Sequence, residues 1–193
     1  WRDDLWALIE STPNLTWQLL TKRPENVMGM VPETWKVRFP INVWLGTSVE
    51  NQETADERIP HLLETTAQTR FLSCEPLLGP LDLSGRTVES VWFDAEYADL
   101  DPILGQQVEE EGWWINWVIV GGESGAQARP MDIEWARSIR NQCVTAGVPF
   151  FMKQLGGKGN KHEDMEDFPE DLRIRELPPM VDVVVPTDQL VMF

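Results

Sequence analysis

Short hydrophobic runs alternate along the chain with segments whose hydrophobic residues recur at helical spacing. The runs predict five strands, at 16–20, 42–47, 69–73, 114–120 and 148–152. Their residues are hydrophobic on both faces, and helical segments separate most of them. Strands of this kind are typical of a parallel sheet built from β/α units, so the pattern predicts an α/β fold.

Hydrophobic spacing and capping residues predict the helices. The first two are expected at 3–11 and at 24–30, where a proline suits the first turn. Asn51 is a good N-cap for a third helix, which we expect Pro60 to break into two pieces. A fourth helix is predicted between an aspartate cap and a terminal glycine, at 132–147.

Two stretches interrupt this alternation. Residues 84–113 are acidic and lack a clear helical pattern, which predicts an insertion on the surface. The tail, 156–193, is polar and loop-rich at first, with one further strand expected at 181–185. The sequence therefore predicts one domain, 1–155, on which this tail packs.

Composition narrows the class of protein. Its 193 residues are 42% hydrophobic, enough for a sizeable core without disulfides. A net charge of −16 disfavours binding to nucleic acid or to anionic membranes. There is no apolar run of about 18 residues and no signal peptide, so we expect a cytoplasmic protein. The chain opens in a helical pattern without methionine, and we expect it to be the C-terminal part of a longer protein.

Polar or charged residues follow all five predicted strands. In parallel α/β folds the carboxyl ends of the strands meet at one edge, where binding sites are built. The alternative is that these residues are polar only because they meet water. They are Lys22, Arg23, Ser48, Glu50, Cys74, Glu75, Gly121, Gly122, Glu123, Ser124, Lys153 and Gln154.

The segment Gly121-Gly122-Glu123-Ser124 is the most distinctive of these strand ends. Paired glycines let a ligand approach the backbone closely, and the exposed N–H groups can hold an anion. The glutamate can accept hydrogen bonds from an amine or from ribose hydroxyls. A tight turn between a strand and a helix would explain the glycines but not the glutamate.

Three glutamates at the strand ends, Glu50, Glu75 and Glu123, could serve acid–base chemistry or a hard metal ion. The alternative is that they form salt bridges with Lys22, Arg23, Arg70 and Lys153. The two histidines lack partners at zinc spacing, so no metal site built on histidine is predicted. Cys74 is predicted to be a buried thiol rather than a nucleophile.

Five segments resemble an uncharacterised phage and bacterial family that is placed among radical-SAM-like proteins. They are 19–27, 42–60, 70–83, 117–131 and 148–157, in order within 16–178. Family members carry an N-terminal motif of three cysteines, which this chain lacks because it resembles the C-terminal two-thirds. In radical SAM enzymes such a motif holds a [4Fe–4S] cluster that binds S-adenosylmethionine.

The resemblance implies a partial (β/α) barrel from a bacterial host or a phage. It implies that Gly121, Gly122 and Glu123, with Ser124, contact S-adenosylmethionine. Residues that would contact the unknown substrate are Lys22, Arg23, Glu50, Glu75, Lys153 and Gln154, of which Glu50, Glu75 and Lys153 are the catalytic candidates. The cluster and the cofactor are expected of the full-length protein only, and this chain alone is expected to be inactive in radical chemistry.

Two other functions stay open. The first is a non-radical barrel enzyme that uses the three glutamates, and the second is a binding or interaction module whose partner surface is the acidic insertion. Neither the substrate nor the oligomeric state is assigned by the sequence.

Overall fold

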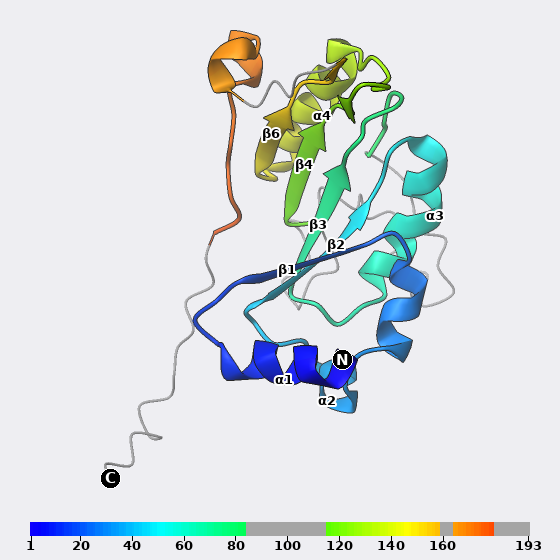
Figure 1. Ribbon diagram of the computed structural model, residues 1–193, viewed down its shortest axis with the longest axis vertical. Helices are drawn as coiled ribbons and strands as arrows, with labels where there is room; N and C mark the ends of the chain where they lie inside the picture. Colours follow the sequence, from blue (N-terminus) through cyan, green and yellow to red (C-terminus); the bar gives the residue numbers. More distant parts are fainter. Residues whose placement is uncertain (84–114, 159–163, 180–193) are drawn as a thin grey trace.

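The protein is built on a sheet of five parallel strands in the order β1-β2-β3-β4-β6 (Figure 1). The computed structural model describes residues 1–83, 115–158 and 164–179, so the predicted insertion and the predicted strand at 181–185 lie outside the described residues. The expected α/β fold with a parallel sheet is confirmed. The strands are β1 (Trp17–Thr21), β2 (Val43–Ser48), β3 (Thr69–Cys74), β4 (Trp117–Gly121) and β6 (Phe150–Gln154).

Helix α4 (Ile133–Ala146) lies behind β4 and β6 in Figure 1, and α3 (Gln52–Leu63) lies to the right of the strands. Two others, α1 (Arg2–Ser11) and α2 (Glu33–Val37), lie at the end where the strands begin. Short 3-10 turns complete the described elements: η1 (Pro24–Gly29), η3 (Met165–Asp167) and η4 (Glu170–Leu172). Among the described helices, none has the length and hydrophobicity needed to cross a membrane.

The capping residues behave as the sequence predicts, but Pro60 does not. Asn51 accepts a hydrogen bond from the Thr54 N–H at the start of α3, and Gly147 ends α4 with a φ of 69°. The expected break at Pro60 is wrong, because α3 continues to Leu63. Proline removes one helical hydrogen bond here, and the last turn still closes through the Glu64 N–H and the Pro60 carbonyl.

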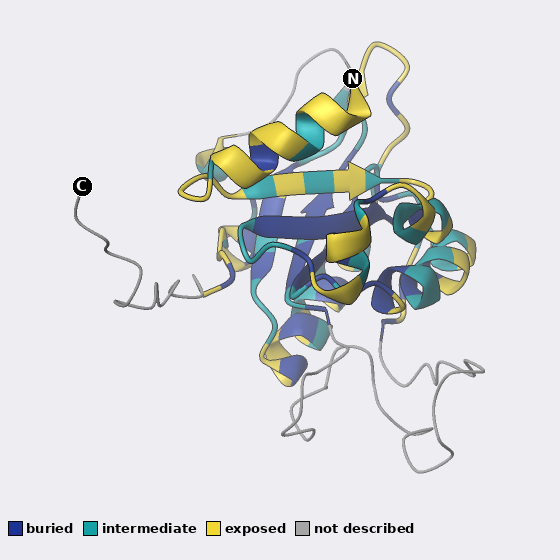
Figure 2. Cartoon of the chain, turned by 90° about the horizontal axis from the view of Figure 1, so that it is seen from below, coloured by how far each residue is buried: buried dark blue, intermediate teal, exposed yellow. Residues whose placement is uncertain are grey.

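The main core lies between the sheet and the helices α3 and α4. Alternate strand residues such as Leu45, Leu72 and Val118 point into it and meet Leu62 and Ile139. Figure 2 shows the central strands buried, whereas α1 and β1 expose much of their surface. This core fixes the sheet, so the positions of the strand ends follow from it.

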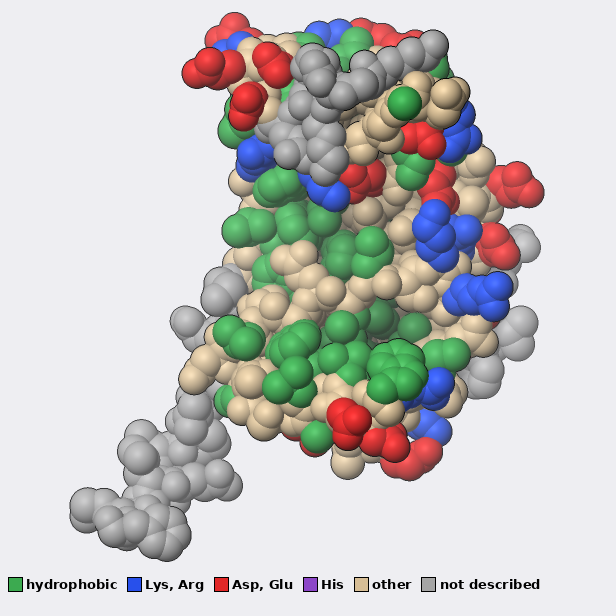
Figure 3. Space-filling view, in the orientation of Figure 1, with side chains coloured by type: hydrophobic (Ala, Val, Ile, Leu, Met, Phe, Trp, Pro, Cys, Tyr) green, Lys and Arg blue, Asp and Glu red, His purple; other side chains and the backbone are tan. Residues whose placement is uncertain are grey.

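The opposite face of the sheet carries a second, aromatic cluster, and we call it the open face. Trp44, Phe71 and Trp117 are its buried members, and Ile119 and Phe151 pack against them. The Trp117 ring centroid lies 5.9 Å from that of Trp44 and 5.7 Å from those of Phe71 and Phe151. In Figure 3, which shows this face, hydrophobic side chains gather across the middle of the molecule.

A segment of the tail, 174–176, runs antiparallel beside β6, and we call it the strap. The Met152 N–H donates to the Ile174 carbonyl (2.8 Å), and the Glu176 N–H donates to the Phe150 carbonyl (3.0 Å). The indole Nε1 of Trp117 donates to the Glu176 carbonyl (2.8 Å). The strap therefore covers the free edge of β6 and holds the aromatic cluster of the open face.

Candidate functional site

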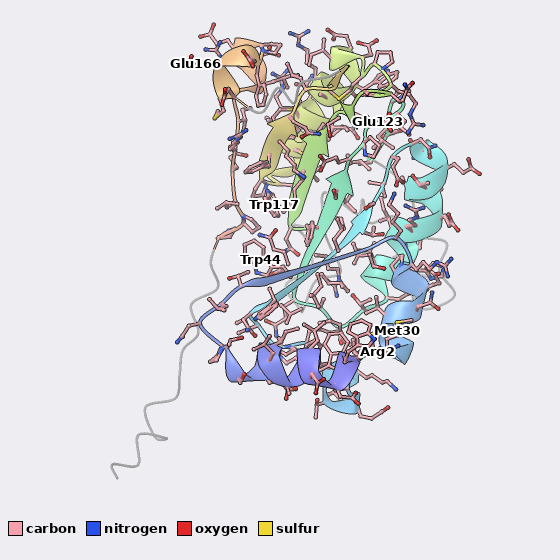
Figure 4. The ribbon with its side chains drawn as sticks, in the orientation of Figure 1. Arg2, Met30, Trp44, Trp117, Glu123 and Glu166 are labelled. Atoms are coloured by element: carbon pink, nitrogen blue, oxygen red, sulfur yellow. The ribbon has the colours of Figure 1, made fainter. Side chains whose placement is uncertain are left out.

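The carboxyl ends of the five parallel strands bring a group of polar residues to one end of the open face. Side chains alternate along a strand, so residues two apart share a face. Trp44, at the other end of β2, marks that face, while Glu123 lies beyond the end of β4 (Figure 4). We call the following group the strand-end site: Ser48, Glu50, Ser73, Glu75, Gly121 and Lys153.

Glu75 and Lys153 form an ion pair that crosses the strand between them. The Lys153 Nζ lies 2.7 Å from the Glu75 Oε2, although β4 separates β3 from β6. A Cβ on Gly121 would lie 3.2 Å from both Cδ and Oε1 of Glu75. The glycine therefore leaves the space in which the carboxylate lies over β4.

A β-bulge in β6 supplies Lys153 at this point. Val120 pairs with Met152, but the next residue, Gly121, pairs with Gln154, so Lys153 is an extra residue in β6. Gln154 is buried, and its Nε2 donates to the Gly122 carbonyl (2.7 Å). The bulge thus lets Lys153 reach Glu75 while Gln154 fixes the loop after β4.

Glu50 is almost buried and has two basic partners. Its Oε1 accepts a hydrogen bond from Lys22, and its Oε2 lies 2.9 Å from the Arg58 Nη1, which also donates to the Ser48 carbonyl. Burial raises the pKa of Glu50, but the Lys22 hydrogen bond and the charges of Arg58 and Lys22 outweigh it, and the net pKa is lowered. Glu50 is therefore an ionised, paired carboxylate.

Glu123 is held by Arg129, which follows it in the same loop. The Arg129 backbone N–H and Nε both lie 2.8 Å from Oε2, and Nη2 lies 3.0 Å from Oε1. The side-chain and backbone hydrogen bonds from Arg129 lower the pKa of Glu123 to about 2. The next residue, Ser124, is exposed and belongs to the short strand β5 (Ser124–Gly125), which pairs with β7 (Gly157–Lys158).

Gly122 is required by the chain's own backbone. A Cβ at this position would lie 2.2 Å from the backbone N of Gly156 and 2.4 Å from its Cα. The space that a ligand would need for a close approach to Gly122 is therefore filled by the loop after β6. At Gly121 the nearest atoms belong to the side chains of Glu75 and Gln154, which can move aside more easily than backbone atoms can.

The three glutamates proposed for acid–base or metal chemistry each have their own basic partner. Glu50 pairs with Lys22 and Arg58, Glu75 with Lys153, and Glu123 with Arg129. Within 1–83, 115–158 and 164–179, no three His, Cys, Asp or Glu residues form a group that could hold a metal ion. The salt-bridge interpretation thus describes all three glutamates, with Arg58 and Arg129 as partners that it did not name.

Two basic residues considered at the sequence level lie elsewhere. Arg70 is buried at the beginning of β3, where its guanidinium donates to the Thr65 carbonyl. Arg23 is exposed after β1, and its backbone N–H donates to the Thr21 hydroxyl (3.0 Å). These contacts place neither arginine beside Glu50, Glu75 or Glu123.

Ser73 is a strand-end residue that sequence reasoning did not single out, and it lies beside Ser48 in the sheet. The two serines are direct partners in the β2–β3 register. They are 3% and 5% exposed, and neither hydroxyl has a hydrogen-bond partner among the described residues. The signal in the sequence is the period of two, since Phe71, Ser73 and Glu75 share one face of β3.

The two cysteines lie in the main core, on the side of α3 and α4. Burial, followed by the charges of Cys143 and Glu50, raises the pKa of the Cys74 thiol. Burial, with the charge of Glu176, raises the pKa of Cys143 to about 12. Both are therefore protonated thiols that face away from the strand-end site.

Comparisons with known proteins give a family but no characterised relative. No curated protein and no solved structure matches the chain. A family model described as "Protein of unknown function (DUF5131)" matches residues 1–180. The expectation of an uncharacterised family is confirmed, whereas the phage origin and the radical-SAM-like relation stay predictions. The match covers most of the sequence, so the chain belongs to the DUF5131 family of proteins of unknown function.

Proposed function

We propose that this chain is the part of a radical-SAM-like enzyme that binds S-adenosylmethionine and substrate at the strand-end site. In this proposal the five parallel strands belong to a partial (β/α) barrel, and the ligands of the [4Fe–4S] cluster come from outside these residues. S-adenosylmethionine supplies hydrogen-abstraction chemistry to enzymes of this class. The residues described here would bind and orient S-adenosylmethionine and the substrate.

The ion pair of Glu75 and Lys153 is the observation that carries the proposal. The methionine part of S-adenosylmethionine ends in an ammonium and a carboxylate, which are complementary to Glu75 and Lys153. Both side chains are partly accessible, at 19% and 49% exposed, so a ligand can reach them. A zwitterionic group between them would replace one ion pair by two, and neither charge would be left unpaired.

The cluster itself does not fit this chain. Its sequence has two cysteines, whereas the motif that holds such a cluster has three. Cys74 and Cys143 are buried in the main core with raised pKa values, so they are poor sources of thiolate ligands. We therefore assign these residues no role in iron chemistry.

Glu123 is a less accessible ligand for the cofactor than the resemblance implies. Three hydrogen-bond donors of Arg129 already bind its two oxygens. Arg129 would have to release the carboxylate before Glu123 could accept a bond from an amine or a ribose hydroxyl. Within the proposal, Gly121 is the better glycine for a close approach, because Gly122 is already in contact with Gly156.

Calorimetric titration of the chain with S-adenosylmethionine tests the proposal. We expect saturable binding that Glu75→Gln and Lys153→Met each weaken at least about tenfold, since each leaves one ligand charge unpaired. The matched control is the exposed ion pair of α2, changed in the same way by Glu33→Gln and Lys36→Met. No saturable binding, or equal affinity in all four variants, would overturn the proposal.

A further inference from the structure

Ser48 and Ser73 are neighbouring serines on the open face. They are more than nine-tenths buried, at 3% and 5% exposed, and are direct partners on β2 and β3. Neither hydroxyl donates or accepts a hydrogen bond within the described part of the chain. Neither oxygen is among the fully enclosed side-chain atoms that lack a partner, so both hydroxyls remain open to a ligand.

The spacing of the two serines indicates what that ligand is. Residues in register on neighbouring strands are about 4.8 Å apart, and a hydroxyl donates over about 2.8 Å. One oxygen atom midway between the serines would accept from both, with an angle of about 120° between the two donors. That angle matches the two lone-pair directions of a carbonyl oxygen, so the pair is suited to binding a carbonyl group.

The surroundings of the serines favour an uncharged carbonyl. Ser73 lies between Phe71 on its own strand and Ile119, its register partner on β4, and both neighbours are hydrophobic. An ionised group would lose its hydration there. Lys153, the nearby cation on β6, already binds Glu75 and is not needed to neutralise a ligand at the serines.

Glu75 adds a hydrogen-bond acceptor beside the serine pair. Its Oε2 binds Lys153, whereas its Oε1 lies over Gly121 and keeps its accepting capacity. Glu75 follows Ser73 by two residues and so shares its face of β3. A ligand held at the serines by its carbonyl oxygen can therefore donate an adjacent N–H to this carboxylate.

We propose that Ser48 and Ser73 bind the carbonyl oxygen of an amide-bearing substrate, whose N–H is accepted by Glu75. The inference rests on the proposed function, because it names the substrate class of the same strand-end site. The amide would lie above the aromatic cluster of the open face. The substrate and S-adenosylmethionine would use neighbouring parts of the site, the former at the serines and the latter at the ion pair.

Protein-observed NMR with benzamide, acetophenone and benzoate tests the assignment. Benzamide carries both the carbonyl and the N–H, acetophenone only the carbonyl, and benzoate a charged carboxylate. We expect saturable shifts of the Ile119 methyl and Trp117 indole signals with benzamide, and weaker binding of acetophenone. Ser48→Ala and Ser73→Ala should each weaken benzamide binding at least fivefold, and Ser48→Cys and Ser73→Cys provide isosteric variants with poorer donors.

The control is Ser138→Ala, an exposed serine on α4 and therefore on the other side of the sheet. It should leave benzamide binding unchanged. No saturable binding of benzamide, equal affinity in the serine variants, or tighter binding of benzoate that Lys153→Met abolishes would each overturn the amide assignment. Titration with S-adenosylmethionine separates the two proposals, because its binding does not depend on the serines and its failure overturns only the proposed function.

Discussion

The carboxylate of Glu75 lies directly against Gly121, so that a single hydrogen-to-methyl change at residue 121 would place a Cβ 3.2 Å from Oε1. This contact lets an acid that directly follows β3 pair with a base on β6 across the strand between them. The geometry of the strand-end site therefore depends on a residue that has no side chain.

Gly121→Ala should displace Glu75 and weaken its ion pair with Lys153. Because Glu75 is a flexible, partly accessible side chain, the free energy of unfolding should fall by less than about 1 kcal/mol. Affinity for S-adenosylmethionine should fall more, by about tenfold. Calorimetry and urea unfolding measure the two effects, with Gly29→Ala as control, since no heavy atom lies within 4 Å of its Cβ position. An alanine variant with unchanged affinity would contradict the role given to Gly121.

Gly122→Ala should affect stability rather than binding alone. Its Cβ would lie 2.2 Å from the backbone of Gly156, and backbone atoms cannot rotate away as a side chain can. We expect the free energy of unfolding to fall by about 1–3 kcal/mol, the usual cost of overpacking. Urea unfolding of this variant beside Gly29→Ala measures the difference. Equal stability of the two variants would show that the loops after β4 and β6 do not need this contact.

Removing Arg129 should raise the pKa of Glu123. The hydrogen bonds of Arg129 lower that pKa from an ordinary 4.5 to about 2. A carboxylate with a depressed pKa in the folded state contributes its stability above pH 4.5 and loses it as the pH falls towards 2. Arg129→Gln should therefore move the Glu123 titration, followed by carbon NMR of the carboxyl group, up towards 4.5.

The exposed Arg2→Gln variant is the control for this titration, because α1 lies at the opposite end of the sheet. It should leave the Glu123 titration where it is. If the pKa of Glu123 stayed near 2 in Arg129→Gln, another group would have to hold the carboxylate.

Both cysteines should be unreactive in the folded protein. Burial raises the pKa of Cys74, and burial raises that of Cys143 to about 12, so neither supplies thiolate near neutral pH. A thiol-specific chromogenic reagent at about pH 8 should label neither residue until urea unfolds the chain. Cys74→Ala and Cys143→Ala separate the two signals. Rapid labelling of Cys74 in the folded state would restore it as a candidate nucleophile.

The central strands of the sheet could be predicted from the sequence because they are buried. A continuous hydrophobic run such as 117–120 leaves few alternatives, and the structure places β4 at Trp117–Gly121. Caps were equally clear, since Asn51 and Gly147 act through local hydrogen bonds and backbone conformation. The short helix α2 was missed, because a helix of five residues carries too little periodic pattern to detect.

The contacts within the candidate site could be predicted only in part. The sequence predicted that acids and bases gather at the strand ends, but it could not assign Arg58 to Glu50 or Arg129 to Glu123, because these partners lie on a helix and in a loop. The bulge at Lys153 depends on how β6 pairs with β4, and hydrophobic pattern alone does not specify this pairing. Ser73 was overlooked because it belongs to a hydrophobic strand rather than to the loop after it.

The strap beside β6 makes the two edges of the sheet unequal. On the β6 side, the backbone groups that could accept a neighbour are already bound by the Ile174 and Glu176 main chain. On the other side, β1 pairs with β2 alone among the described strands, and two of its five residues are exposed. Within 1–83, 115–158 and 164–179, the edge of the sheet that is left for an additional strand is therefore the one beside β1.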